Sequence, residues 1–410
     1  EAGNIHSTLP AKFATYTGEL QKAGYKTGYT GKGWSPGKLA PGGRIENPAG
    51  TSYAKRNLQP PFKAIRNTDY AGNFDDFLDA VEKETPFCFW LGTSEPHRAY
   101  ENGAGKRTGK DPAKVIVPSI FPDNAIVRSD LLDYYVEIEH FDLMVQRAIA
   151  SLEKRGHLDN TIVVVTSDHG MPFPRAKASL YDWGSRVPLA IRWPRGIRNP
   201  GRDVKDFVHL SDLAPTFIEA AGADVPSMMT ASSLMKIFSD QNMNDRDAAY
   251  IAMERHDGCR EGGKGYPCRA VRTQDYLYIY NFEPGRWPSG SPDPRVCARS
   301  IPFGEIDTSP TKSFMMESRM EHGIAHLAEL SFGMRPAEEL YDLKKDPEQL
   351  ANVAGLIEYS AIQHARRRQL FDHLKKTRDP RVVGGKVEWD HYPYYGRIST
   401  PGWKVTEKKN

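Results

Sequence analysis

The sequence predicts an α/β fold: a mixed, mostly parallel sheet sandwiched by helices, with a smaller C-terminal α+β subdomain. Residues 161–166 form an apolar, β-branched run after the long helical pattern of residues 129–155, and residues 86–94 form a second apolar run after a shorter one. Such runs are typical of strands buried on both faces of a parallel sheet. From about residue 248, short alternating strands separated by turn residues indicate an antiparallel meander.

The expected elements divide the chain into three parts. Helical patterns cover residues 10–24, 73–83, 129–155 (with Ser129 as N-cap), 211–221 and 357–376, and strand patterns begin at residues 25, 86, 161, 187, 248, 269, 276 and 339. We therefore expect an α/β domain at residues 1–240, an antiparallel-sheet subdomain with a closing helix at residues 245–378, and an irregular tail at residues 379–410.

Composition narrows the possible partners. The chain has 410 residues, 39% of them hydrophobic, which is typical of a globular protein with a sizeable core. A net charge of +3, without a Lys/Arg block, argues against a nucleic-acid partner and suits a small anionic substrate. The sequence has no run of about 18 apolar residues, so we expect no membrane span.

The four cysteines give a weak indication of the compartment. Cys259 and Cys268 lie close together in a glycine-rich loop and could form a small disulfide, while Cys88 is expected to be a buried thiol and Cys297 has no expected partner. This pattern mildly favours an oxidising compartment.

Ionisable residues follow the expected strands. Asp168 and His169 end the run at residues 161–166, and His97 and Arg98 come just after residues 86–94. Ligands of open α/β sheets bind beyond the carboxyl ends of the strands, where a carboxylate and an imidazole could hold a divalent cation. Alternatively, Asp168 caps the next element and His169 fills a polar loop. Lys32 lies in a glycine-rich turn that could approach a ligand, or is an ordinary solvated lysine.

Five motifs occur in a recognisable order: Gly-Tyr-Lys-Thr-Gly-Tyr-Thr-Gly-Lys at residues 24–32, Glu-Pro-His-Arg at 95–98, Thr-Ser-Asp-His-Gly-Met-Pro-Phe-Pro at 166–174, the lysine loop at 177–188, and Glu-Leu-Tyr-Asp-Leu-Lys-Lys-Asp-Pro-Glu at 339–348. Together they resemble the type I sulfatases of the alkaline phosphatase superfamily, and most closely the sulfamidase (N-sulfoglucosamine sulfohydrolase) branch. The resemblance covers nearly the whole chain and implies an alkaline-phosphatase-like fold.

The resemblance also implies a mechanism. In that family an oxidised Cys or Ser, formylglycine, attacks sulfur and forms a covalent sulfate, while one calcium ion acts as Lewis acid. By resemblance, Asp168 and His169 would be calcium ligands, Lys32 and Lys177 would bind the sulfate, and His97 would be the general acid.

The implied substrates are sulfate esters or sulfamates on sulfated sugars, such as glycosaminoglycan fragments. Arg98, His256 and Asp257 would line the sugar pocket, although His256 could equally be a loop imidazole held by Asp257. For an enzyme acting on sulfated glycans, the resemblance implies secretion to the periplasm or outside the cell.

The chain departs from the family pattern in two respects. A (Cys/Ser)-x-(Pro/Ala)-x-Arg motif in the nucleophile's role and the paired aspartates of the calcium site are missing; in the family both lie upstream of the point where this chain begins, so we expect them in an N-terminal segment. Trp34 stands where the family has a histidine. Two alternatives stay open: a phosphoryl or phosphonate hydrolase of the same superfamily, and a non-catalytic homologue that binds sulfated glycans.

Overall fold

The first sheet is parallel and carries the Lys32 turn. A computed structural model describes residues 5–34, 37–241 and 246–406, so residues 1–4 of the expected α/β domain, residue 245 of the subdomain and residues 407–410 of the tail lie outside it. The strands are β1 (Lys26–Gly31), β2 (Thr51–Ser52) and β3 (Phe87–Gly92), in the order β2-β1-β3. The parallel sheet predicted from the apolar runs is confirmed here.

The carboxyl ends of β1 and β3 approach each other closely because both strands end in glycine. Gly31 pairs with Gly92 and has a φ of +70°, a conformation that favours glycine. A Cβ at Gly92 would lie 2.0 Å from the carbonyl oxygen of Lys32. Any larger residue at position 92 would therefore push Lys32 out of its place.

A second, two-stranded sheet contains β4 (Val163–Thr166) and β5 (Leu189–Arg192), which are antiparallel. The prediction that residues 161–166 form a strand is confirmed, but the prediction that both of its faces are buried in a parallel sheet is wrong. All four residues of β4 are only half-buried, because β5 is its sole strand partner within the described residues.

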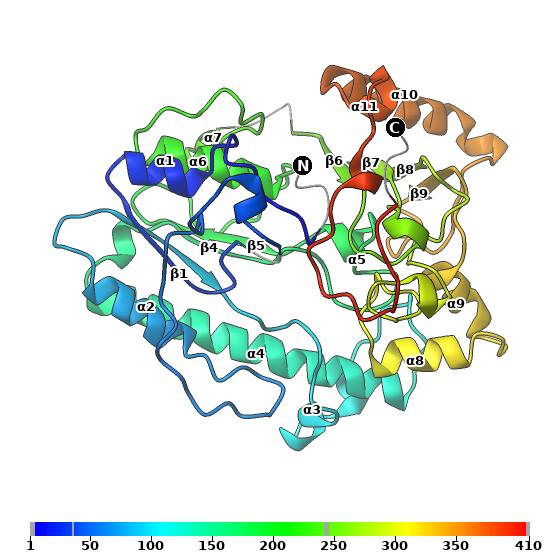
Figure 1. Cartoon of the computed structure of the whole chain (residues 1–410), viewed down its shortest axis with the longest axis horizontal. Coiled ribbons are helices and arrows are strands. Elements are labelled where there is room, and N and C mark those ends of the chain that lie inside the picture. Colours follow the sequence, from blue (N-terminus) through cyan, green and yellow to red (C-terminus); the bar gives the residue numbers. More distant parts are fainter. Residues whose placement is uncertain (1–4, 35–36, 242–245, 407–410) are drawn as a thin grey trace.

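Helices cover both faces of these sheets (Figure 1). On one side, α1 (Tyr16–Lys22) packs against α6 (Leu213–Ala220). On the other side lie α2 (Tyr70–Asp79) and α4 (Ala125–Lys154), whose apolar cluster includes Phe77, Phe89 and Val163. Since β3 and β4 both contribute to this cluster, the two sheets rest on one helical layer. Within the described residues, no helix combines the length and apolar character needed to cross a membrane.

The longest helix, α4, begins earlier than the sequence predicts. The side chain of Asn124, in extended conformation, accepts hydrogen bonds from the N–H groups of Ile126 and Val127, at 2.9 and 3.0 Å. Asn124 is therefore the N-cap, and the predicted cap Ser129 lies inside the helix. Shorter helices are α3 (Ala104–Arg107), α5 (Asp182–Ser185), α7 (Met235–Phe238) and α11 (Pro380–Val383).

The C-terminal part is the predicted antiparallel meander. Its strands, in the order β6-β7-β8-β9, are β6 (Ala248–Met253), β7 (Cys268–Thr273), β8 (Tyr276–Asn281) and β9 (Glu338–Asp342). The closing helix α10 (Ser360–Lys376) packs on β7 and β8. Two helices between β8 and β9, α8 (Pro310–Glu317) and α9 (Ala325–Phe332), were not predicted.

The cysteines are arranged differently from the sequence expectation. Cys268 starts β7 opposite Met253 and belongs to a buried apolar cluster, whereas Cys259 lies in the loop between β6 and β7. The sulfur of Cys259 lies 3.4 Å from that of Cys297. The disulfide that Cys259 and Cys268 could form is not present, because the hairpin register places Cys268 at the start of β7 while Cys259 lies in the loop beside Cys297.

Candidate active site

Residues from four separate segments meet beyond the carboxyl ends of the strands. Lys32 follows β1, His97 follows β3, Asp168 follows β4, and Lys177 lies in the loop before α5. The charges of Asp168 and Lys177 both act on Lys32, and those of Lys177 and Lys32 both act on His97. The structure thus brings together His97 and Asp168, which the sequence places at strand ends, Lys32 of the glycine-rich turn, and Lys177 of the lysine loop.

The main chain of Lys32 is fixed by two hydrogen bonds. Its N–H donates to the carbonyl oxygen of Gly92 at 2.6 Å, and its own carbonyl oxygen accepts from the indole N–H of Trp90 at 2.6 Å. Partial desolvation lowers the pKa of Lys32, Asp168 opposes this by raising it, and Lys177 lowers it further. A site that holds two ammonium groups within interaction range is suited to an anion.

The imidazole of His97 is oriented by its own loop. Its Nδ1 lies 2.5 Å from the carbonyl oxygen of Arg98, which makes Nδ1 the donor and assigns Nε2 as the nitrogen free to exchange a proton. Desolvation and the neighbouring Lys177 lower the pKa of His97 below 6.5, while Asp307 raises it. The balance of these charges determines how much of the imidazole is protonated near neutral pH.

Asp168 and His169 form the candidate metal pair. The Nδ1 of His169 lies 2.7 Å from the carbonyl oxygen of Gly170, so its Nε2 is free to coordinate, and this nitrogen lies 3.8 Å from Asp168 Oδ1. Calcium takes 6–8 ligands, mostly oxygens. No group of three or more Asp, Glu, His or Cys side chains suited to a metal exists within the described residues. The pair offers one carboxylate and one imidazole nitrogen, which is fewer ligands than calcium takes.

Lys177 is held by a carboxylate that the sequence did not single out. Its Nζ lies 2.6 Å from Oδ2 of Asp307, and the two side chains are only 5% and 12% exposed. Burial opposes ionisation of Asp307, but Lys177 and then His97 lower the pKa of its carboxyl group. Asp307 is therefore an anionic member of the site.

His256 and Asp257 have separate partners. The Nδ1 of His256 lies 2.6 Å from Oε2 of Glu305, whose other carboxylate oxygen accepts from Arg260 at 2.7 Å. Asp257 instead accepts from Tyr394 and pairs with Arg299, at 2.6 and 2.5 Å. The alternative in which Asp257 holds His256 is therefore not seen. The charge of His256 acts on His169, so His256 lies within electrostatic range of the candidate metal pair.

Arg98 does not join the other predicted residues. Its guanidinium forms a two-pronged contact with Asp130, at 2.7 and 3.0 Å, and its Nε donates to the carbonyl oxygen of Pro172 at 2.9 Å. The side chains of Arg98 and Asp130 are 4% and 1% exposed. All three nitrogens of Arg98 thus donate within the protein.

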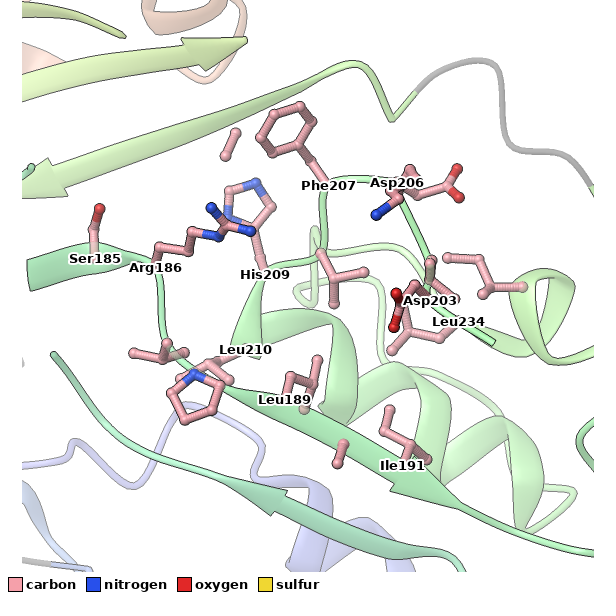
Figure 2. Close-up of a pocket in the computed structure, with 18 of the residues that line it drawn as sticks. Ser185, Arg186, Leu189, Ile191, Asp203, Asp206, Phe207, His209, Leu210 and Leu234 are labelled. Carbon is pink, nitrogen blue, oxygen red and sulfur yellow. The ribbon is translucent and has the colours of Figure 1, made fainter. Parts of the chain in front are cut away.

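A groove borders the metal pair. It is lined by Asp168 and His169, by residues of β5 and by the segment at residues 199–210. Figure 2 shows Leu189 and Ile191 of β5 on its apolar wall, with Arg186 and His209 on a polar part of the lining. The site is therefore open on this side to a ligand larger than a single anion.

Two known protein families match the part of the chain that contains these site residues. Residues 6–223 match the family described as Sulfatase, and residues 172–287 match the domain described as N-sulphoglucosamine sulphohydrolase, C-terminal. The chain belongs to the sulfatase family. The family match includes β1 to β5 and therefore the segments that carry Lys32, His97, Asp168 and Lys177.

Curated relatives of this sulfatase-family chain are distant. An ulvan-active sulfatase of Formosa agariphila is 26% identical over 75% of this chain and 50% of its own length. The human N-sulphoglucosamine sulphohydrolase is 24% identical over 74% of this chain and 63% of its own length. The chain thus spans between about half and two thirds of the length of these relatives.

Solved structures share the fold of this chain. A protein solved in complex with its substrate D-glucosamine-2-N,6-O-disulfate has a TM-score of 0.64 at 19% identity, covering 94% of this chain and 86% of its own. A phosphonate monoester hydrolase from Silicibacter pomeroyi has a TM-score of 0.62 at 17% identity, covering 92% and 82%. The fold alone does not distinguish sulfate from phosphonate chemistry.

Proposed function

We propose that this chain forms the main part of a calcium-dependent sulfatase that hydrolyses sulfate esters or sulfamates on sulfated sugars. The observation that supports this most is the convergence of two lysines, one histidine and one aspartate beyond the ends of β1, β3 and β4. In this proposal Lys32 and Lys177 neutralise the sulfate oxygens, whose negative charge grows as the bond to the sugar breaks.

His97 supplies the proton in this proposal. The contact from Nδ1 to the carbonyl oxygen of Arg98 leaves Nε2 to carry the proton toward the departing oxygen or nitrogen of the sugar. Proton donation matters because a sugar alkoxide or amide anion is a poor leaving group. An imidazole with Lys177 and Lys32 nearby releases its proton more readily than a free one.

Asp168 and Nε2 of His169 would hold the calcium ion. When bound there, calcium supplies a Lewis acid that polarises a sulfate oxygen. The free Nε2 of His169 and the 3.8 Å spacing to Asp168 support this assignment. The remaining ligands would come from outside the described residues.

We further propose that an additional strand lies between the two sheets and carries the formylglycine and the remaining calcium ligands. β3 pairs only with β1, and β4 only with β5, in the part of the chain that the structure describes. Both strands rest on the α2–α4 layer, and Trp90 in β3 is 45% exposed. A strand between them would pair with both open edges and cover this apolar surface.

Sulfated glucosamine is the proposed substrate class. One relative is named N-sulphoglucosamine sulphohydrolase, and one protein of the same fold was solved with D-glucosamine-2-N,6-O-disulfate. His256, held by Glu305 within electrostatic range of the metal pair, is proposed to contact the sugar. Such a substrate also supports the proposed location in the periplasm or outside the cell.

The test is sulfate release by the full-length protein loaded with calcium. N-sulfated and 6-O-sulfated glucosamine, an aryl sulfate and a phosphonate monoester would be supplied in parallel. The proposal predicts sulfate release from the sulfated glucosamines. Faster cleavage of the phosphonate would support the phosphonate hydrolase instead, and tight binding of sulfated glucosamine without release would support a non-catalytic binder.

A further inference from the structure

Two buried cysteines face each other in the C-terminal part of the chain. Cys259 lies in the loop after β6, and Cys297 follows a short turn at residues 294–296. Both residues are 0% exposed, and their sulfurs are 3.4 Å apart. We propose that Cys259 and Cys297 form a disulfide that joins these two segments in the folded protein.

The backbone already holds the two segments together. The N–H of Ala298 donates to the carbonyl oxygen of Gly258 at 2.7 Å, and the N–H of Ser291 donates to that of Cys259 at 2.8 Å. These bonds lie next to the two cysteines in the sequence and fix their approach. A disulfide has an S–S bond of about 2.05 Å, so the sulfurs need to move closer by only about 1.4 Å.

A glycine keeps the space around the sulfurs free. A Cβ placed on Gly304 would lie 2.6 Å from the sulfur of Cys297 and 2.7 Å from that of Cys259. Any side chain at this position would therefore press the sulfurs out of place. The close packing of a glycine against both sulfurs is compatible with a cross-link at this point.

The surroundings of the two cysteines lower the pKa of Cys297 and raise that of Cys259. The hydrogen bond with Cys259, together with the backbone N–H groups of Ile301 and Arg299, outweighs the opposing effect of burial and lowers the pKa of Cys297 to about 6. The pKa of Cys259 is raised, by its hydrogen bond with Cys297 and by burial. In the folded arrangement Cys297 is therefore the more acidic thiol of the pair, whereas during folding the thiolate of either cysteine can be the nucleophile in disulfide exchange.

The chemistry needs an external disulfide, such as glutathione disulfide, as oxidant. For instance, the thiolate of Cys297 attacks one sulfur of the oxidant, which releases one thiolate and leaves a mixed disulfide on Cys297. Cys259 then loses its proton and attacks Cys297, which releases the second thiolate. Two electrons pass from the cysteines to the oxidant, which ends as two thiols. Because both cysteines are buried, the exchange takes place while the two segments are still open during folding.

The disulfide would connect two segments that contribute side chains to the candidate site. Cys259 comes three residues after His256, and Glu305 and Asp307 lie on the segment that follows Cys297. The disulfide would therefore stabilise the placement of these side chains relative to each other. The inference itself does not depend on sulfatase activity, since it rests on the sulfurs and their surroundings.

A tryptic map of the full-length protein, folded with glutathione disulfide and alkylated without reduction, tests the proposal. Trypsin places Cys259 in the peptide of residues 256–260, Cys297 in residues 296–299 and Cys268 in residues 265–269. We expect peptides 256–260 and 296–299 as one species, two hydrogen atoms lighter than their sum. Recovery of both as alkylated peptides, or of 256–260 joined to 265–269, overturns the proposal.

Melting temperature gives a second readout. Closing a loop of this length predicts that reductant lowers the Tm of the wild-type protein by about 5 °C. The Tm of Cys297→Ser should not respond to reductant, whereas that of Cys88→Ser should respond like the wild type. If Cys297→Ser does not fold, the wild-type comparison and the peptide map still decide. A wild-type Tm that is the same with and without reductant contradicts the proposal.

Discussion

Lys177 Nζ lies 2.6 Å from Asp307 Oδ2, although the two residues are 130 positions apart in the chain. The contact joins the α/β part to the segment between β8 and α8. It places a carboxylate directly beside a lysine that we propose to bind sulfate. Asp307 therefore holds Lys177 in position and at the same time reduces the positive potential available to an anion.

Replacing Asp307 should separate these two effects. We expect Asp307→Asn to lower Tm, because Lys177 is left as a nearly buried cation without its ion-pair partner. Inorganic sulfate should bind about five times more tightly, since about 1 kcal/mol of repulsion is removed. Calorimetry of sulfate binding measures this, with Asp293→Asn at an exposed ion pair as control. An unchanged sulfate affinity in Asp307→Asn would show that the charge of Asp307 does not act on the bound anion.

Because of Glu305, the free energy of unfolding should depend on pH in the acidic range. Burial opposes its ionisation, but Arg260 and His256 lower its pKa from 4.5 to about 2. Its contribution to the free energy of unfolding is therefore complete above pH 4.5 and is lost as pH falls toward 2. The loss amounts to about 3 kcal/mol. Chemical denaturation at several pH values should show this slope in the wild type and a smaller one in Glu305→Gln; equal slopes would refute the assignment.

Arg98 should act on stability rather than on sugar binding. Its side chain and that of Asp130 are almost fully buried, and Tyr100 and Phe173 lie against the guanidinium, at 4.3 and 4.4 Å from their ring centroids. We expect Arg98→Ala to lower the free energy of unfolding by about 3–5 kcal/mol. Arg98→Lys should not restore it, because an ammonium group cannot make both contacts to Asp130. A variant with wild-type Tm but a raised KM for sulfated glucosamine would restore the predicted sugar-binding role.

Calcium should stabilise the full-length protein through Asp168. At a calcium concentration about 100 times the Kd, binding adds about 2.7 kcal/mol to the free energy of unfolding. Thermal melting with calcium and with EDTA should therefore differ for the wild type and much less for Asp168→Asn. Asp293→Asn again serves as the surface control and should respond like the wild type. The same calcium response in Asp168→Asn would exclude this residue as a ligand.

The sequence predicts those features that depend on local pattern. Apolar runs locate β3 and β4, and the polar residues that follow them, such as His97 and Asp168, come together because they lie at the carboxyl ends of strands, although β3 and β4 belong to different sheets. The meander from residue 248 follows the order of the strands in the chain, since each strand pairs with the next one.

Features that depend on distant segments could not be predicted. Asp307 and Glu305 come from a loop without periodic pattern, and only tertiary packing brings them to Lys177 and His256. The nearness of Cys259 and Cys268 in sequence was misleading, because the register that pairs Met253 with Cys268 separates a core position from the loop. The N-cap of α4 could not be predicted because asparagine and serine are about equally favourable N-cap residues, so the sequence does not distinguish Asn124 from Ser129.

Replacement of Lys177 tests the central proposal most directly. The measurement is kcat/KM for sulfate release from D-glucosamine-2-N,6-O-disulfate by the calcium-loaded, full-length protein, compared with Lys177→Met and with the surface variant Lys344→Met. We predict that Lys177→Met lowers kcat/KM by about 100-fold or more, as expected when a charged contact to the transition state is lost, while Lys344→Met stays within about twofold of the wild type. Equal rates for Lys177→Met and the wild type, or no sulfate release from any sulfated sugar by the wild type, would contradict the account.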